Sequence, residues 1–147
     1  MITELNVEHL ALLIALEQRA QSGTSETQML AALGSQDTCV LGWWQAEQLL
    51  GYAIVARLPF EAELQAIGVH PEQRCSGGGQ ALMEVVLSTA RGWLSERLLL
   101  EVRAGNLSAI RLYQRCGFSE DGWRKGYYPA ANGAAGREDA LLMSQIL

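Results

Sequence analysis

The chain contains, at residues 67–82, the run Ile67-Gly-Val-His-Pro-Glu-Gln-Arg-Cys-Ser-Gly-Gly-Gly-Gln-Ala-Leu82. A short apolar strand is predicted to end at Val69, and a helix is predicted to begin at Gly79, where apolar residues start to recur at helical spacing. A glycine-rich turn between a strand and a helix can direct several backbone N–H groups at one anion, near the positive end of the helix. The run therefore predicts a strand–turn–helix unit that binds a phosphate-bearing ligand.

Two common phosphate-binding motifs do not fit this run. A P-loop ends in Gly-Lys-Ser/Thr, whereas here the glycines are followed by Gln80 and Ala81. A dinucleotide fingerprint has its third glycine at the position that holds Leu82. What remains is Arg74 followed by Gly77 and Gly79, and the alternative reading is an ordinary glycine-rich turn without a ligand.

Hydrophobic periodicity divides the rest of the chain into alternating helices and strands. Helices are predicted at 7–20, 26–33, 79–94 and 106–116, and strands at 38–45, 50–58, 62–69, 97–102, 118–128 and 139–146, with a loop of small residues at 129–136. This order predicts one α/β domain over residues 1–147, built on a mixed sheet. Ligands of such sheets bind beyond the C-terminal ends of adjacent strands, so the glycine run and the segment that follows the strand at 97–102 are expected to lie together.

Composition and charge restrict the possible functions. A chain of 147 residues with 49% hydrophobic residues fits one globular domain with a full core. The net charge of −5 argues against a nucleic-acid-binding surface. The acidic balance suits a basic peptide as substrate, although most acidic proteins have no such partner.

Cysteine and histidine give no sign of a metal or disulfide site. The three cysteines form no CxxC pattern, which favours free thiols in a reducing, cytoplasmic compartment. The two histidines are far apart, so no metal is expected. Neither a signal peptide nor an apolar run of about 18 residues is visible, so no membrane partner is expected.

The second informative run is Leu99-Leu-Glu-Val-Arg-Ala-Gly-Asn-Leu-Ser-Ala-Ile-Arg-Leu-Tyr-Gln-Arg-Cys-Gly-Phe118. Glu101 interrupts an apolar strand, so its carboxylate either faces solvent beside Arg103 or has a chemical purpose. Asn106 stands at a predicted helix start and can cap it. Tyr113 follows seven residues later on roughly the same helix face, either as a core aromatic or as a functional group.

Together the two runs resemble the GNAT acetyltransferases over nearly the whole chain. The closing segments Arg124-Lys-Gly-Tyr-Tyr-Pro129 and Gly136-Arg-Glu-Asp-Ala-Leu-Leu-Met143 are similar to those of the RimI branch, the ribosomal-protein alanine N-acetyltransferases. The resemblance implies a mixed, mostly antiparallel twisted sheet flanked by helices, with acetyl-CoA as co-substrate. It also implies acetyl transfer to an N-terminal alanine of a small-subunit ribosomal protein, by an enzyme expected to be a monomer or weak dimer.

The resemblance assigns roles to single residues. Glu101 would take a proton from the amino group, and Tyr113 would protonate the thiolate that leaves. A backbone N–H at Val69 or its neighbour would stabilise the oxyanion. The residues expected to bind the cofactor are Ile67, Gly68, Val69, Arg74, Cys75, Ser76, Gly77, Gly78, Gly79, Gln80, Asn106 and Tyr113.

The acceptor is expected to meet a second group of residues, which are Glu61, Tyr127, Tyr128, Arg137, Glu138 and Asp139. Each has an alternative: the tyrosines can be packing aromatics, the charged run a solvated turn, and Glu61 with Glu63 a solvated edge rather than an attraction for a basic peptide.

Two departures from the family pattern affect these expectations. Cys75 and Gln80 stand where relatives usually have basic residues. Gln21-Ser-Gly-Thr-Ser-Glu26 stands where relatives have an aromatic-Pro-Trp segment that shapes the peptide pocket. The acceptor therefore stays open between an N-terminal peptide, a small-molecule amine and a lysine side chain, and a CoA-binding protein without turnover is a further alternative.

Overall fold

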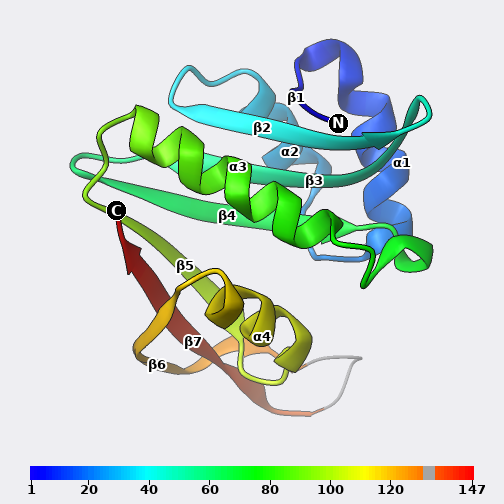
Figure 1. The fold of residues 1–147 in the computed structure, drawn as a ribbon. Helices are drawn as coiled ribbons and strands as arrows, with labels where there is room; N and C mark the ends of the chain where they lie inside the picture. Colours follow the sequence, from blue (N-terminus) through cyan, green and yellow to red (C-terminus); the bar gives the residue numbers. More distant parts are fainter. Residues whose placement is uncertain (131–134) are drawn as a thin grey trace.

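The computed structural model describes residues 1–130 and 135–147. Its centre is a seven-stranded sheet in the order β1-β2-β3-β4-β5-β7-β6 (Figure 1). The strands are β1 (Ile2–Glu4), β2 (Thr38–Gln45), β3 (Gln48–Arg57), β4 (Glu61–Val69), β5 (Arg97–Arg103), β6 (Ser119–Pro129) and β7 (Arg137–Ile146). The helices are α1 (Leu10–Ala20), α2 (Glu26–Leu33), α3 (Gly78–Gly92) and α4 (Leu107–Arg115), with 3-10 turns η1 (Val7–His9) and η2 (Pro71–Gln73).

Only one pair of neighbouring strands is parallel in the described sheet, β4 with β5. The predicted mixed, mostly antiparallel sheet is therefore confirmed. The parallel pairing is also short, because it covers only Glu61–Leu64 against Arg97–Leu100. Beyond Leu64, β4 continues along β3 to Val69, while β5 continues along β7 to Arg103. The two strands therefore separate in the middle of the sheet (Figure 1).

The helices cover the two faces of the sheet separately. On one face α3 and α4 contribute Leu82, Val86 and Ile110 to the larger core cluster. On the other face α1 and α2 contribute Leu13 and Met29 to a second cluster, and Figure 1 shows α2 behind the strands. Strand β3 supplies residues to both clusters and is buried along nearly its whole length, as expected for a strand between two helical layers. None of the helices among the described residues is long and apolar enough to cross a membrane.

The polar connection between α1 and α2 is fixed by a buried tyrosine. The side chain of Tyr52 is fully buried, and its hydroxyl oxygen lies 2.8 Å from Oε1 of Glu17 and 2.7 Å from the hydroxyl oxygens of both Ser22 and Thr24. The other carboxylate oxygen of Glu17 accepts a hydrogen bond from the backbone N–H of Gly23 at 2.8 Å. A side-chain network therefore orders the polar segment between α1 and α2.

Most predicted element boundaries agree with the structure within a few residues, and the differences have local causes. The three-residue strand β1 is absent from the prediction, because a strand this short shows no periodicity and is defined by its pairing with β2. The predicted helix at 7–20 is divided into η1 and α1, since Asn6 caps a 3-10 turn first. The predicted loop at 129–136 includes residues 131–134, which lie outside the described residues.

Replacing Tyr52 with Phe is expected to destabilise the fold. The change removes a buried hydroxyl that contacts Glu17, Ser22 and Thr24, and loss of such a hydrogen-bonded group costs about 0.5–1.5 kcal/mol. Chemical denaturation of the two proteins measures the difference. Tyr127→Phe is the control, since this tyrosine is 44% exposed. Equal stability of the Tyr52→Phe variant and the unchanged protein would show that the network does not hold the segment.

Replacing Gly78 with Ala is expected to destabilise the start of α3. A Cβ atom at this position would lie 2.4 Å from Cζ3 of Trp43, closer than any normal contact. Trp43 is buried and has little room to move, so overpacking of about 1–3 kcal/mol is expected. Gly92→Ala at the other end of the same helix is the matched control, because no atom lies within 4 Å of its added Cβ. A similar thermal shift for both variants would contradict this explanation.

Candidate active site

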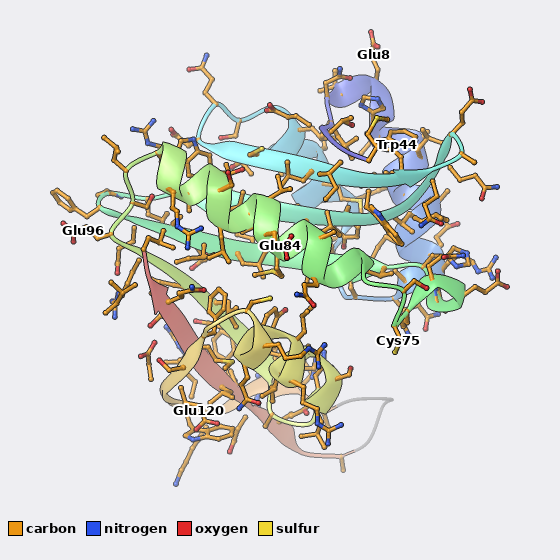
Figure 2. All side chains as sticks on the ribbon, in the orientation of Figure 1. Glu8, Trp44, Cys75, Glu84, Glu96 and Glu120 are labelled. Carbon is orange, nitrogen blue, oxygen red and sulfur yellow. The ribbon has the colours of Figure 1, made fainter. Side chains whose placement is uncertain are left out.

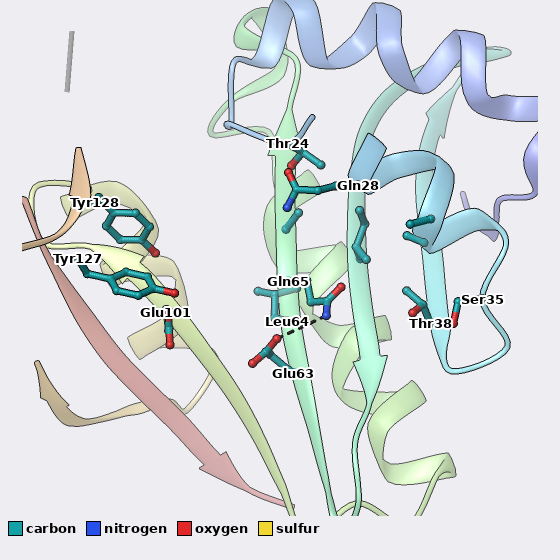
Figure 3. Close-up of a pocket in the computed structure, with 14 residues that line it drawn as sticks. Thr24, Gln28, Ser35, Thr38, Glu63, Leu64, Gln65, Glu101, Tyr127 and Tyr128 are labelled. Carbon is teal, nitrogen blue, oxygen red and sulfur yellow. Dashed lines mark hydrogen bonds between the residues drawn. The ribbon is translucent and has the colours of Figure 1, made fainter. Parts of the chain in front are cut away.

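The separation of β4 and β5 brings Glu101 to the edge of an opening. Glu101 is the first residue of β5 beyond the last pair with β4, and it is half-buried. Its Oε1 lies 3.3 Å from Nε of Arg124 on β6, in a pair whose side chains are 28% and 53% exposed. Figure 3 shows the carboxylate projecting into the space between the strands, next to the hydroxyl groups of Tyr127 and Tyr128.

A cavity of about 630 Å³ adjoins Glu101 on the side of the sheet that α1 and α2 cover. Strand β4 and helix α2 form one wall, and the two tyrosines of β6 form the other (Figure 3). The lining residues are Thr24, Gln28, Ala31, Ala32, Ser35, Thr38, Ile54, Glu63, Leu64, Gln65, Ala66, Glu101, Tyr127 and Tyr128. The cavity is large enough for a short peptide end, and its lining combines apolar with polar groups.

Arginine side chains support both tyrosines of this wall. The rings of Tyr127 and Tyr128 meet edge to face, with centroids 4.9 Å apart. Arg124 lies 5.1 Å from the ring centroid of Tyr127, and Arg103 lies 4.5 Å from that of Tyr128. Burial, and after it the charge of Glu101, raises the pKa of Tyr128. The phenol of Tyr128 therefore stays protonated beside the carboxylate and can donate a hydrogen bond into the cavity.

The charged run at 137–139 contacts the protein itself and does not line the cavity. Arg137 donates hydrogen bonds to the backbone oxygens of Gly126 and Tyr127 at 2.6 and 2.9 Å. Asp139 accepts one from the N–H of Gly126 at 2.9 Å. Glu138 accepts one from Arg103 at 2.9 Å, which lowers the pKa of its carboxyl. These residues therefore hold the part of β6 that presents Tyr127 and Tyr128.

The two acidic residues at the start of β4 have different surroundings. Glu61 forms an ion pair with Arg97 at 2.8 Å, at the end of β4 opposite to Val69, and does not line the cavity. Glu63 lies two residues further along the strand and does line it. The sequence alone predicts the same surroundings for Glu61 and Glu63, because strand periodicity puts both side chains on one face of the sheet.

The glycine run ends in an uncapped helix terminus. Helices α2 and α4 are capped by the side chains of Ser25 and Asn106, whereas α3 begins after Gly77 without a side-chain cap. The N–H groups of residues 78–80 donate to no other described residue. Three free N–H groups at the start of a long helix fit a phosphate group, as the sequence predicts.

Each of the three glycines has its own physical reason. Gly77 has a φ of +86°, a conformation that favours glycine. Gly78 has no room for a side chain beside Trp43, and a Cβ on Gly79 would lie 3.2 Å from Leu112 of α4. The run therefore also lets α3 pack closely on β2 and α4.

The other residues of this loop divide between protein contacts and solvent. Arg74 donates a hydrogen bond from Nη2 to the backbone oxygen of Ala20 at 2.9 Å, which ties the loop to the end of α1. Cys75 is an exposed free thiol on the loop before α3 (Figure 2). Ser76 and Gln80 are both exposed as well.

The end of β4 directs backbone groups into the opening. Residues 67–69 pair with β3 on one side only, because β5 has already turned away. The N–H of His70 donates to the backbone oxygen of Leu50 on β3 at 2.8 Å. Since successive N–H groups of a strand point to opposite sides, the N–H of Val69 points toward the opening.

Tyr113 and Asn106 lie on α4. Tyr113 is only 4% exposed and packs against Phe118, with ring centroids 5.9 Å apart. Its hydroxyl forms no hydrogen bond with any other described residue, in contrast to that of Tyr52. Since tyrosine hydroxyls in folded proteins usually have a partner, a hydroxyl without one in the described part of the chain is available to a ligand. Burial raises the pKa of Tyr113, which keeps the proton on the phenol.

Asn106 caps α4, with Oδ1 accepting a hydrogen bond from the N–H of Ala109 at 3.3 Å. Its side-chain amide group remains available on an exposed residue. Among the described residues no group of three His, Cys, Asp or Glu side chains could hold a metal ion.

Comparisons with known proteins agree with this geometry. Residues 7–118 match the acetyltransferase (GNAT) family. The chain is 32% identical to the ribosomal protein bS18-alanine N-acetyltransferase of Escherichia coli K12 over 143 residues, which cover 97% of this chain and 95% of that protein. The crystal structure of the Escherichia coli ribosomal-protein-S18-alanine N-acetyltransferase superposes with a TM-score of 0.90 at 32% identity, over 99% of this chain and 92% of that one.

A third relative is considerably longer. An uncharacterized protein of Mycobacterium leprae is 39% identical over 115 residues, which cover 76% of this chain but only 30% of that protein. The family match spans most of the chain, and the Escherichia coli relative is matched over nearly its full length. The chain belongs to the acetyltransferase (GNAT) family and is an acetyl-CoA-dependent N-acetyltransferase.

Proposed function

We propose that the protein acetylates the α-amino group of an N-terminal alanine, on a small-subunit ribosomal protein. The observation that carries this proposal is the position of Glu101, which faces a cavity wide enough for a peptide end at the point where β4 and β5 separate. The acceptor would enter from the side of α2, and the acetyl donor from the side of α3. The full-length similarity to the Escherichia coli bS18-alanine N-acetyltransferase supports this choice of acceptor.

Glu101 is proposed to remove the proton of the incoming amine. An α-ammonium group has a pKa near 7.7–8.0, so at neutral pH most of it carries a proton and cannot attack. Glu101 can take that proton directly or through one water molecule. Nε of Arg124 lies 3.3 Å from the Glu101 carboxylate, and the Arg124 side chain is 53% exposed. This ion pair has to weaken when the ammonium group of the acceptor binds.

Val69 and Tyr113 are proposed to stabilise the negative charge that develops on acetyl-CoA. Acetyl-CoA, bound with its phosphates at the start of α3, supplies an acetyl group activated as a thioester. The N–H of Val69 points toward the opening and would donate to the carbonyl oxygen as negative charge builds there. The free, protonated hydroxyl of Tyr113 would give its proton to the departing sulfur.

Glu101→Gln is expected to reduce kcat by roughly 10²–10⁴-fold at neutral pH, the usual contribution of a general base. Binding of acetyl-CoA should change little, because Glu101 lies on the acceptor side of the opening. Thiol release with an alanine peptide measures the rate, and calorimetric titration measures acetyl-CoA binding. Full turnover by the variant would remove Glu101 from the mechanism.

Tyr113→Phe is expected to slow turnover by roughly a hundredfold without a large loss of stability, since its hydroxyl has no hydrogen-bond partner among the described residues. The Tyr52→Phe variant provides the comparison, because there the stability should fall first. If Tyr113→Phe unfolds at a much lower denaturant concentration while the folded fraction keeps its rate, Tyr113 is only a packing residue.

An acceptor panel tests the function itself. We expect thiol release from acetyl-CoA with peptides that begin with a free alanine, and none with the same peptides acetylated in advance. Release with polyamines or lysine peptides alone would leave the acetyltransferase chemistry intact but overturn the proposed acceptor. Acetyl-CoA binding without release for any amine would overturn the proposal in favour of a binding protein.

A further inference from the structure

We propose that Glu63 selects acceptors that carry a lysine or arginine as their second residue. This inference rests on the proposed function, because it concerns the peptide that enters the same cavity. It goes further by naming which side chain of the peptide is recognised and which residue recognises it.

Two carboxylates line the cavity, and only one of them has a positive partner. Glu101 pairs with Arg124 at 3.3 Å. Glu63 is half-buried and contacts Nε2 of Gln65 at 3.5 Å, and it forms no ion pair with any Lys, Arg or His among residues 1–130 and 135–147. Figure 3 shows Glu63 extending from β4 into the space that faces Glu101. A half-buried charge in a binding cavity without a partner is suited to a cationic ligand group.

The neighbouring arginines already have partners. Arg97 binds Glu61, Arg103 binds Glu138, and Arg124 lies between Glu101 and Tyr127. None of these arginines lines the cavity. The cationic group that would pair with the Glu63 carboxylate therefore has to be supplied by the acceptor.

Strand register indicates which residue of the acceptor this is. Glu63 is paired with Leu99, so Glu101, two residues further along β5, is its diagonal neighbour on the same face. Diagonal neighbours in a paired sheet are about 7–8 Å apart, and because β4 and β5 separate at Glu101, the two carboxylates here are at least that far apart. If the amine of the first residue meets Glu101, the second Cα lies about 3.8 Å beyond the first, and a long cationic side chain covers the remaining distance.

The rest of the wall also favours a polar side chain at this place. Thr24, Gln28 and Gln65 line the cavity on the side of Glu63, and Thr38 lies further along it. Glu17 and Tyr52 hold Thr24 in position through the network at the end of α1. A large apolar side chain would find few apolar partners there, whereas a lysine or arginine could also extend its stem along Ala66.

The test compares kcat/KM for two peptides that begin Ala-Arg and Ala-Gln and are otherwise identical, in three proteins. The unchanged protein is expected to prefer the Ala-Arg peptide, and Glu63→Gln should reduce the ratio of the two values by about tenfold, as loss of one charged hydrogen-bonded contact does. Glu61→Gln is the matched control, because Glu61 lies two residues away on the same strand, has the same charge and does not line the cavity. It should leave the ratio unchanged.

Two further measurements separate a local contact from a general effect of charge. Glu63→Lys should reverse the preference, so that an Ala-Glu peptide becomes better than Ala-Arg. Moving the arginine from the second to the third residue should remove the advantage. Thermal unfolding of all variants confirms that each is folded.

Failure of this inference differs from failure of the proposed function. If the unchanged protein acetylates Ala-Arg and Ala-Gln peptides equally well, the role of Glu63 is overturned while N-terminal acetylation stands. If Glu61→Gln lowers the ratio as much as Glu63→Gln does, the preference is a surface-charge effect and Glu63 is not the selecting residue. If no alanine peptide is acetylated, both proposals fall.

Discussion

The separation of β4 from β5 is the constraint on which the site depends. Parallel pairing stops at Leu64 and Leu100, whereas each strand stays paired with its own antiparallel neighbour to its end. The separation frees one side of β4 for contacts with a ligand and brings Glu101 to the edge of the cavity. The separation of β4 and β5 sets the relative positions of the glycine run, the cavity and Tyr113. If β4 and β5 stayed paired to their ends, the same side chains would be present, but the two strands would close the space between them.

The acceptor side of the site is built from contacts that are mostly polar. Glu17 and Tyr52 order the segment between α1 and α2, and Arg137, Glu138 and Asp139 order the segment that carries the two tyrosines. Both walls of the cavity are therefore held by hydrogen bonds, and the wall of the two tyrosines also by aromatic and arginine–ring contacts. Because buried hydrogen-bond networks depend on direction as well as distance, this arrangement fixes the cavity shape and is sensitive to single substitutions.

Much of this arrangement could be predicted from the sequence, because its signals are local. The glycine run, the cap at Asn106 and the apolar periodicity of the main helices and strands each depend on neighbouring residues. Contacts between distant segments could not be predicted. Glu61 and Glu63 share a strand face, and only the packing of Arg97 beside one of them separates their surroundings. The bonds of Arg137 and Asp139 to β6, and those of Tyr52 to Glu17, likewise require the folded chain.

The short β4–β5 pairing also changes where the sheet has unpaired backbone groups. An ordinary open sheet has unpaired backbone groups at its two margins, where another strand can attach. In this sheet β4 and β5 have further unpaired edges in the interior, beyond Leu64 and Leu100. The backbone amides there, among them that of Val69, lack the protection that neighbouring strands give, although they belong to the central strands. Amide hydrogens in the middle of this sheet should therefore exchange with water faster than those of β3, and a ligand that fills the opening would slow them.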